Sequence, residues 1–187
     1  MSGEIQIIHG LQTLFSAPGW HAFAVFCARD LIYFLVIPVA LTGVWRKNKS
    51  LGKAAYRAAF AALLAYGLAI LLGWILGRIR PFHASAEIAL WINPPLTYYS
   101  FPSGHASVSF AVAFAILYGN VSLGLVTMLM ATGIVLGRVV TGVHYPTDII
   151  AGAALGFLAY TIIDTAMHHL SVRRVKKTAA TPIEPHV

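Results

Sequence analysis

The sequence has little charge and almost no sulfur available for cross-links. Only 10% of its 187 residues are charged, with six acidic against 13 basic residues, and 58% are hydrophobic. So few charges cannot cover the surface of a soluble protein of this size, which excludes an ordinary soluble fold. The lone Cys27 excludes an internal disulfide and lies in an apolar run, where packing is its expected role. We therefore expect one domain embedded in a lipid bilayer.

Long apolar runs are what the sequence does contain. A run of roughly 20 residues crosses ~30 Å of hydrocarbon as a helix. Because backbone polar groups find no partners in lipid, such runs must be helical. The expected fold is all-α: a polytopic membrane helix bundle of about five transmembrane helices in a single domain, residues 1–170. The runs lie at residues 22–45, 58–77, 104–119 (the shortest), 121–141 and 148–168.

Positive charge is concentrated at two places. Lys and Arg mark the cytoplasmic side of membrane proteins, so we interpret the net charge of +7 as a topology signal and expect no nucleic-acid partner. With both clusters in the cytoplasm, five spans place the N-terminus outside and the tail, residues 171–187, inside. This polar tail is expected to be disordered. The clusters are Arg46, Lys47, Lys49, Lys53 and Arg57, and Arg173, Arg174, Lys176 and Lys177.

Residues 4–16 carry an apolar stripe at helical spacing. This pattern predicts a short N-terminal helix that lies in the membrane interface. The stripe consists of Ile5, Ile8, Leu11, Leu14 and Phe15.

Histidine, arginine and helix-start signals are concentrated in three short segments, which the expected topology places on the outer side. Arginine presents a fork of donors that suits phosphate oxygens. Ser103 is a good N-cap, and Pro146 suits the first turn of a helix, so two helix N-termini would point at one anion. The segments are Arg80-Pro81, then Pro102-Ser103-Gly104-His105, then Arg138 with His144 and Asp148.

His144 and Asp148 lie four residues apart, one helical turn. Asp148 can accept a hydrogen bond from one imidazole nitrogen and leave the other free to act as a nucleophile. His105 comes from another segment and could protonate the departing oxygen as a general acid.

These segments closely resemble the signature of the type 2 phosphatidic acid phosphatase family: Lys-x6-Arg-Pro, Pro-Ser-Gly-His and Ser-Arg-x5-His-x3-Asp. The second part is complete here. In the third part Gly137 replaces the leading Ser, and in the first part Gly73 stands at the Lys position.

The resemblance implies a phosphohistidine intermediate on His144. Asp148 would orient this histidine, and His105 would protonate the leaving group. No metal and no cofactor is implied. The phosphate-binding groups implied are Arg80, Ser103, the Gly104 amide and Arg138.

The absent lysine leaves one phosphate contact without a donor. Arg78, two residues before Arg80, is one possible substitute. Arg29 is another, because a buried arginine in a membrane span usually faces an interior partner. For Arg29 we favour an ion pair with Asp30, or an extension toward the outer headgroups.

Small size, five spans and an outward-facing site resemble bacterial enzymes that convert undecaprenyl diphosphate to undecaprenyl phosphate. A bacterial cytoplasmic membrane is the expected location. Phosphatidylglycerophosphate, phosphatidate and lipid A phosphate stay open as substrates, and the sequence does not give the oligomeric state. A lipid phosphate transporter or a catalytically silent scaffold is the alternative from another class. The absence of an internal repeat disfavours the transporter, and the presence of His105, His144 and Asp148 disfavours the scaffold.

Overall fold

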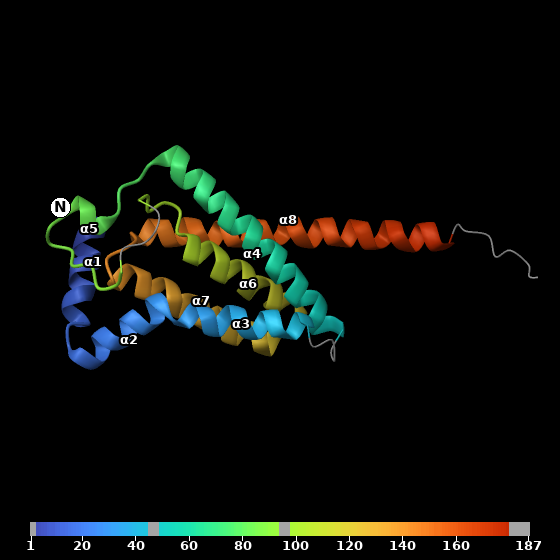
Figure 1. Cartoon of the computed structure of the whole chain (residues 1–187), viewed down its shortest axis with the longest axis horizontal. Helices are drawn as coiled ribbons and strands as arrows, with labels where there is room; N and C mark the ends of the chain where they lie inside the picture. Colours follow the sequence, from blue (N-terminus) through green and yellow to red (C-terminus); the bar gives the residue numbers. More distant parts are fainter. Residues whose placement is uncertain (1–2, 45–48, 94–97, 180–187) are drawn as a thin grey trace, which may run out of the picture.

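Helices make up nearly all of the computed structural model, which describes residues 3–44, 49–93 and 98–179. In this part of the chain there are eight helices and no strand (Figure 1). The helices are α1 (Gly3–Leu14), α2 (Pro18–Arg29), α3 (Leu31–Val44), α4 (Lys49–Leu76), α5 (Pro81–Ala84), α6 (Gly104–Gly119), α7 (Val121–Val140) and α8 (Pro146–Ala179).

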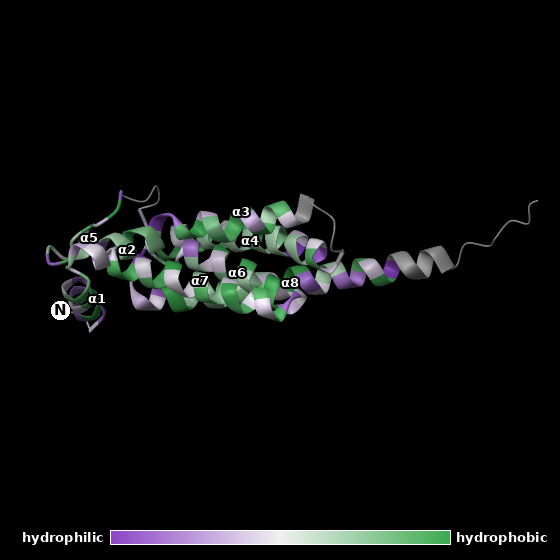
Figure 2. Ribbon diagram, turned by 90° about the horizontal axis from the view of Figure 1, so that it is seen from below, coloured by the Kyte–Doolittle hydropathy of each residue, from purple (hydrophilic) through white to green (hydrophobic). Residues whose placement is uncertain are grey.

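Four helical stretches of the described residues are long and apolar enough to cross a membrane, and α6 is a shorter apolar helix of 16 residues. Hydrophobic residues dominate the bundle along its length, and hydrophilic ones increase where α8 extends beyond it (Figure 2). The expected all-α membrane bundle is therefore confirmed. The four stretches are Pro18–Thr42, Ser50–Leu76, Val121–Val140 and Pro146–Arg173.

The first expected span consists of two helices, α2 and α3, that meet at Asp30. The Arg29 guanidinium donates to both carboxylate oxygens of Asp30 at 2.9 Å. The interpretation of Arg29 as the ion-pair partner of Asp30 is confirmed, and Arg29 does not line the candidate site described below.

Helix α6 lies at the centre of the bundle and packs against α4, α7 and α8. Its small side chains allow this close packing, because Ala and Ser let helix backbones approach one another. The partner glycines on α8 are required for the same reason. A Cβ atom on Gly152 would lie 2.7 Å from Ser103 O, and one on Gly156 would lie 2.5 Å from Ser107 O.

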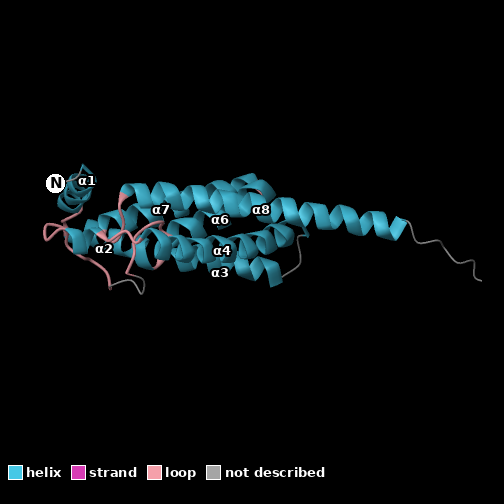
Figure 3. Ribbon diagram, turned by 90° about the horizontal axis from the view of Figure 1, so that it is seen from above, coloured by secondary structure: helices cyan, strands magenta, loops and turns pink. Residues whose placement is uncertain are grey.

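The long loops gather at one end of the bundle (Figure 3), where α1 and α5 also lie (Figure 1). Helix α4 ends there because Gly77 adopts a left-handed conformation, with φ of 64°, that stops the helix. The loop before α6 and the turn after α7, which carry residues of the segments predicted to share the outer side, do meet there, since Trp91 N donates to Thr141 O at 3.3 Å. Lys53 and Arg57 lie toward the opposite end of α4, whereas Arg46 and Lys47 are outside the described residues.

Two expectations about the ends of the chain need correction. Helix α8 continues to Ala179, so residues 171–179 of the expected disordered tail are helical. Hydropathy marks where lipid burial stops, whereas a helix continues through Lys and Arg because their propensity is high. In α1, Ile5 and Ile8 are buried against Val139 and other residues of the protein, so this part of the stripe does not face lipid.

Candidate active site

Two loop segments that pair with each other hold Arg80 at the loop end of the bundle. Ile79 and Tyr99 form an isolated antiparallel bridge, and Ser100 N donates to Arg78 O at 2.8 Å. Arg80 then occupies the N-cap position of the short helix α5, whose first residue is Pro81, without a capping hydrogen bond from its side chain. This pairing directs the Arg80 side chain inward, where Nη1 donates to Val143 O at 2.9 Å.

The tight turn between α7 and α8 carries His144. Gly142 has φ of 78°, and a Cβ atom there would lie 2.6 Å from Ala89 O, so the turn requires glycine. Helix α8 then begins at Pro146. Asp148, in its first turn, reaches back to accept a hydrogen bond from Tyr145 N at 2.8 Å. His144 and Asp148 thus lie on one compact helix start, as their spacing predicted.

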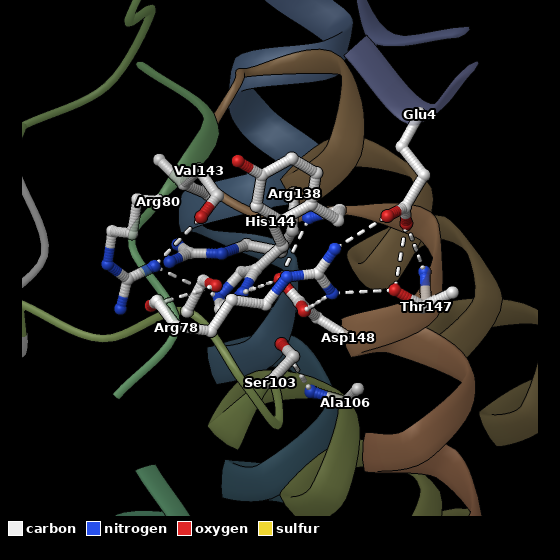
Figure 4. A network of polar contacts seen from close by, with 12 residues as sticks. Glu4, Arg78, Arg80, Ser103, Ala106, Arg138, Val143, His144, Thr147 and Asp148 are labelled. Atoms are coloured by element: carbon white, nitrogen blue, oxygen red, sulfur yellow. Dashed lines mark hydrogen bonds and ion pairs between the residues drawn. The ribbon is translucent and has the colours of Figure 1, made fainter. Parts of the chain in front are cut away.

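His144 and Asp148 make only long contacts in this structure (Figure 4). His144 Nδ1 lies 3.4 Å from Asp148 Oδ2, which is beyond good hydrogen-bond length. The other ring nitrogen, Nε2, lies 3.3 Å from Arg80 Nη1. A proton on Nδ1, facing Asp148, leaves the Nε2 lone pair available for attack, and such contacts commonly shorten once substrate is bound.

The N-terminus of α6 meets the start of α8. Ser103 caps α6, with its hydroxyl accepting from Ala106 N at 3.4 Å. Its own backbone N donates to Asp148 O at 3.1 Å. The predicted Ser103 N-cap is therefore present, and the first turns of both helices lie at one place.

A cavity of about 290 Å³ opens between these elements. Arg138, in the last turn of α7, forms part of the cavity wall. This side chain is 5% exposed, its Nη1 donates to Ala28 O at 3.3 Å, and its Nε has no hydrogen-bond partner among the described residues. The cavity is lined by Arg80, Gly104, His105, Arg138 and His144, and by Tyr66, Ala69, Ile70, Gly73, Trp74, Asn93, Tyr99, Phe101 and Pro102.

Burial sets the charge states around His144. Burial, with the charges of Arg138 and Arg80, lowers the pKa of His144 to about 4, while Asp148 opposes this shift. Burial also lowers the pKa of Arg80 to about 10, so this guanidinium stays charged at neutral pH. A neutral imidazole therefore lies beside a cation.

The structure places most of the predicted site residues together. His105, His144, Arg80, Arg138 and Gly104 line the cavity. Asp148 and Ser103 are fully buried immediately behind this wall.

Arg78 does not line the cavity. Its guanidinium lies on the other side of Asp148, where it binds that carboxylate, Thr147 and Glu4. Glu4 was missed in the sequence, and its only signal there was an acidic residue in the first turn of a largely apolar helix.

The two departures from the family signature have different structural settings. A Cβ atom on Gly137 would lie 2.6 Å from Ala28 N, so close packing of α2 on α7 leaves no room for the signature serine. Gly73 lines the cavity, and a Cβ atom there would only reach ordinary contact, 3.5 Å from Phe101 O. The position of the signature lysine therefore lines the cavity and can accept a Cβ atom without a clash.

Metal ligation is not indicated by the geometry of the described residues, because no three His, Cys, Asp or Glu side chains gather in a way that could hold an ion. The chemistry of the site is that of two buried guanidinium groups, two imidazoles and a carboxylate.

Known proteins show similarity along most of the chain. A decaprenylphosphoryl-5-phosphoribose phosphatase of Mycobacterium tuberculosis is 29% identical over 87% of this chain and 90% of its own length. A putative undecaprenyl-diphosphatase, YbjG, of Escherichia coli is 29% identical over 86% and 82%. The bacitracin transport permease protein BcrC of Bacillus licheniformis is 30% identical over 72% of this chain, which spans 65% of that relative.

A solved structure and a family model also match. The crystal structure of Aquifex aeolicus LpxE superposes with a TM-score of 0.64, at 24% identity, over 86% of this chain and 92% of that one, which shows a shared fold. The model of the PAP2 superfamily matches residues 54–171, which include every cavity-lining residue. The chain belongs to the PAP2 superfamily, in which its relatives include lipid phosphatases.

Proposed function

We propose that this protein removes the terminal phosphate of undecaprenyl diphosphate, with a phosphohistidine intermediate on His144. The observation that carries this proposal is the buried Arg138, whose Nε lacks a partner in the same cavity as a neutral His144. A buried cation with an unfilled donor requires an anion. A terminal phosphoryl group supplies that anion and an electrophilic phosphorus.

In the first step, His144 Nε2 attacks the terminal phosphorus. The bond from phosphorus to the bridging oxygen breaks, and His105 donates a proton to the departing undecaprenyl phosphate. Arg80 and Arg138 stabilise the charge on the equatorial oxygens, and the α6 and α8 N-termini add their positive ends.

In the second step, water attacks the phosphohistidine. His105, now neutral, takes a proton from this water, the N–P bond breaks, and inorganic phosphate leaves. His105 is then protonated and His144 is neutral, which restores the starting state. No redox change and no metal enters this sequence.

An apolar wall supports a long lipid chain as the leaving group. Tyr66, Ala69, Ile70 and Trp74 of α4 line the cavity next to the polar centre. Trp74 and Tyr66 are also largely exposed, so the protein does not enclose this wall and a lipid chain can reach it. Two of the relatives carry polyprenyl lipids in their names, which favours undecaprenyl diphosphate over phosphatidylglycerophosphate, phosphatidate and lipid A phosphate.

The loop end of the bundle is proposed to face the outside of a bacterial cytoplasmic membrane. The basic residues at the start of α4 and along the end of α8 support this orientation by the positive-inside rule. The exposed Glu87, replaced by Cys in a Cys27→Ser background, should react with an impermeant thiol reagent in intact cells. Labelling only after lysis would show that the loop end faces the cytoplasm, opposite to the proposed orientation.

Phosphate release by the detergent-purified protein tests the function. Undecaprenyl diphosphate, phosphatidylglycerophosphate and phosphatidate are compared side by side in EDTA. We expect preferential release from undecaprenyl diphosphate and its loss in His144→Ala, whereas His9→Ala, which changes an exposed histidine of α1, keeps full activity. Equal activity of His144→Ala would end the phosphohistidine mechanism and favour transport or scaffolding. Reversible loss of activity in EDTA would contradict a mechanism without a metal ion.

A further inference from the structure

Arg78 lies between the buried Asp148 and the N-terminal helix α1. Its Nη1 donates to Asp148 Oδ1 and to Thr147 Oγ1, both at 2.6 Å. Its Nη2 forms an ion pair with Glu4 Oε2 at 2.5 Å. The guanidinium also lies over the ring of Tyr145, 3.9 Å from its centroid. One side chain thus joins residue 145 to residues 4, 147 and 148, and Figure 4 shows its contacts with the last three.

Asp148 depends on this contact. Its side chain has no exposure to solvent, and a buried carboxylate is costly unless its oxygens are paired. Oδ2 accepts from Tyr145 N and faces His144, which leaves Oδ1 to be satisfied by Arg78. A fixed Oδ1 holds the plane of the carboxylate and so determines how Oδ2 meets the imidazole.

Glu4 in turn determines where Arg78 points. Its Oε1 accepts from Thr147 N at 3.1 Å and from Thr147 Oγ1 at 2.8 Å, which fixes the carboxylate on the first turn of α8. Burial opposes ionisation, but the hydrogen bonds from Thr147 and Arg78 lower the pKa of Glu4, so it is negatively charged at neutral pH. This charge therefore holds Nη2 of Arg78 beside the first turn of α8.

The packing of helix α1 positions Glu4 beside the first turn of α8. Ile5 and Ile8 are buried in a cluster with Val139 of α7. Further along, Gln12 Nε2 donates to Ala89 O at 2.7 Å and to Val140 O at 3.0 Å. The helix is therefore held at both ends against the active-site loops.

We propose that Arg78 and Glu4 are positioning residues that orient Asp148, and through it His144, so that α1 is a working part of the active site. This inference rests on the proposed function, because it requires Asp148 to orient a His144 nucleophile. In this proposal Arg78 binds the carboxylate of Asp148 and does not bind the substrate phosphate.

Steady-state kinetics of Glu4→Gln and Arg78→Gln test the assignment, with Glu87→Gln as the matched control. Glu87 is an exposed carboxylate at the same end of the bundle. We expect kcat to fall about tenfold or more in both variants while KM stays within about twofold, as when groups that orient a reactive side chain are removed. Arg78→Lys keeps the charge but not the fork, and should also lose kcat.

A second measurement separates positioning from a general loss of structure. In an Asp148→Asn background, Glu4→Gln should cause no further loss of kcat, because the path through Asp148 is already broken. Additive losses, or a kcat of Glu4→Gln equal to that of Glu87→Gln, would overturn the proposal. Failure of the proposed function is distinct, since His144→Ala would then retain turnover in the same assay. Should Glu4→Gln not yield folded protein, Arg78→Lys in both backgrounds decides the question by the same criteria.

Discussion

Arg80 Nη1 lies 3.3 Å from Nε2 of His144, the nitrogen proposed to attack phosphorus. The same guanidinium can therefore hold the phosphate and bias the protonation of the nucleophile. Both effects act in the same direction, because a cation attracts the phosphate and repels a proton from the imidazole.

The acid limb of kcat/KM should lie below pH 6.5. The pKa of His144 is lowered to about 4, so the imidazole stays neutral and nucleophilic as the pH falls through the ordinary histidine range. Arg80→Gln removes a charge that lowers this pKa, so the residual activity should show its acid limb at higher pH. Measuring both proteins with one substrate cancels the titration of the phosphate itself. An acid limb at the same pH in both proteins would contradict the effect of the Arg80 charge on the pKa of His144.

Asp148→Asn should reduce kcat on the order of 10³-fold with little change in KM. An amide in place of the carboxylate no longer favours the proton on Nδ1 and cannot stabilise an imidazolium as the phosphohistidine forms and breaks. Single-turnover release of phosphate from the purified variant measures the effect. Asp164→Asn is the control, because Asp164 pairs with Arg57 away from the cavity.

Gly137→Ser, which restores the family serine, should destabilise this chain by about 1–3 kcal/mol. The new Cβ atom would meet the backbone of Ala28, which cannot move aside without shifting α2. Gly133→Ser is the control on the same helix, since its Cβ would approach only the end of the Leu31 side chain, at 3.3 Å. Thermal unfolding in detergent compares the two, and equal midpoints would contradict the close packing of α2 on α7.

Gly73→Lys should lower KM for a lipid diphosphate. The position lines the cavity and accepts a Cβ atom at ordinary contact distance, so a lysine there adds a phosphate-binding cation. Gly73→Met supplies a side chain of similar length without charge and should not lower KM. Inhibition by inorganic phosphate gives a second readout, because the lysine variant should be inhibited at lower concentration.

Local sequence signals predicted the polar centre well. The four-residue spacing of His144 and Asp148 predicted that they lie close together, and they are 3.4 Å apart although His144 precedes the first residue of α8. The capping chemistry of Ser103 predicted the start of α6. Apolar run lengths predicted the spans for the same reason, since a bilayer demands a minimum length. In each case the determining interaction lies within a few residues of chain.

Other features depend on tertiary packing, which composition does not encode locally. Glu4 and Arg78 are 74 residues apart and meet only because α1 docks on the loops. The first span divides at Asp30 although the whole stretch Pro18–Thr42 is apolar enough to cross a membrane. Arg78 was considered a phosphate ligand because its charge is visible in the sequence, whereas its pairing with the buried Asp148 is visible only in the fold.

The hydrogen bonds between Glu4 and Thr147 join residues that lie 143 positions apart in the sequence. A contact of such sequence separation forms late, because most of the intervening chain must be ordered before its two ends can meet. Insertion of the earlier spans alone would leave Arg78 without Asp148. Phosphatase activity should therefore emerge only after α8 has been synthesised and has packed against α1. An active site then indicates that both helices are in place.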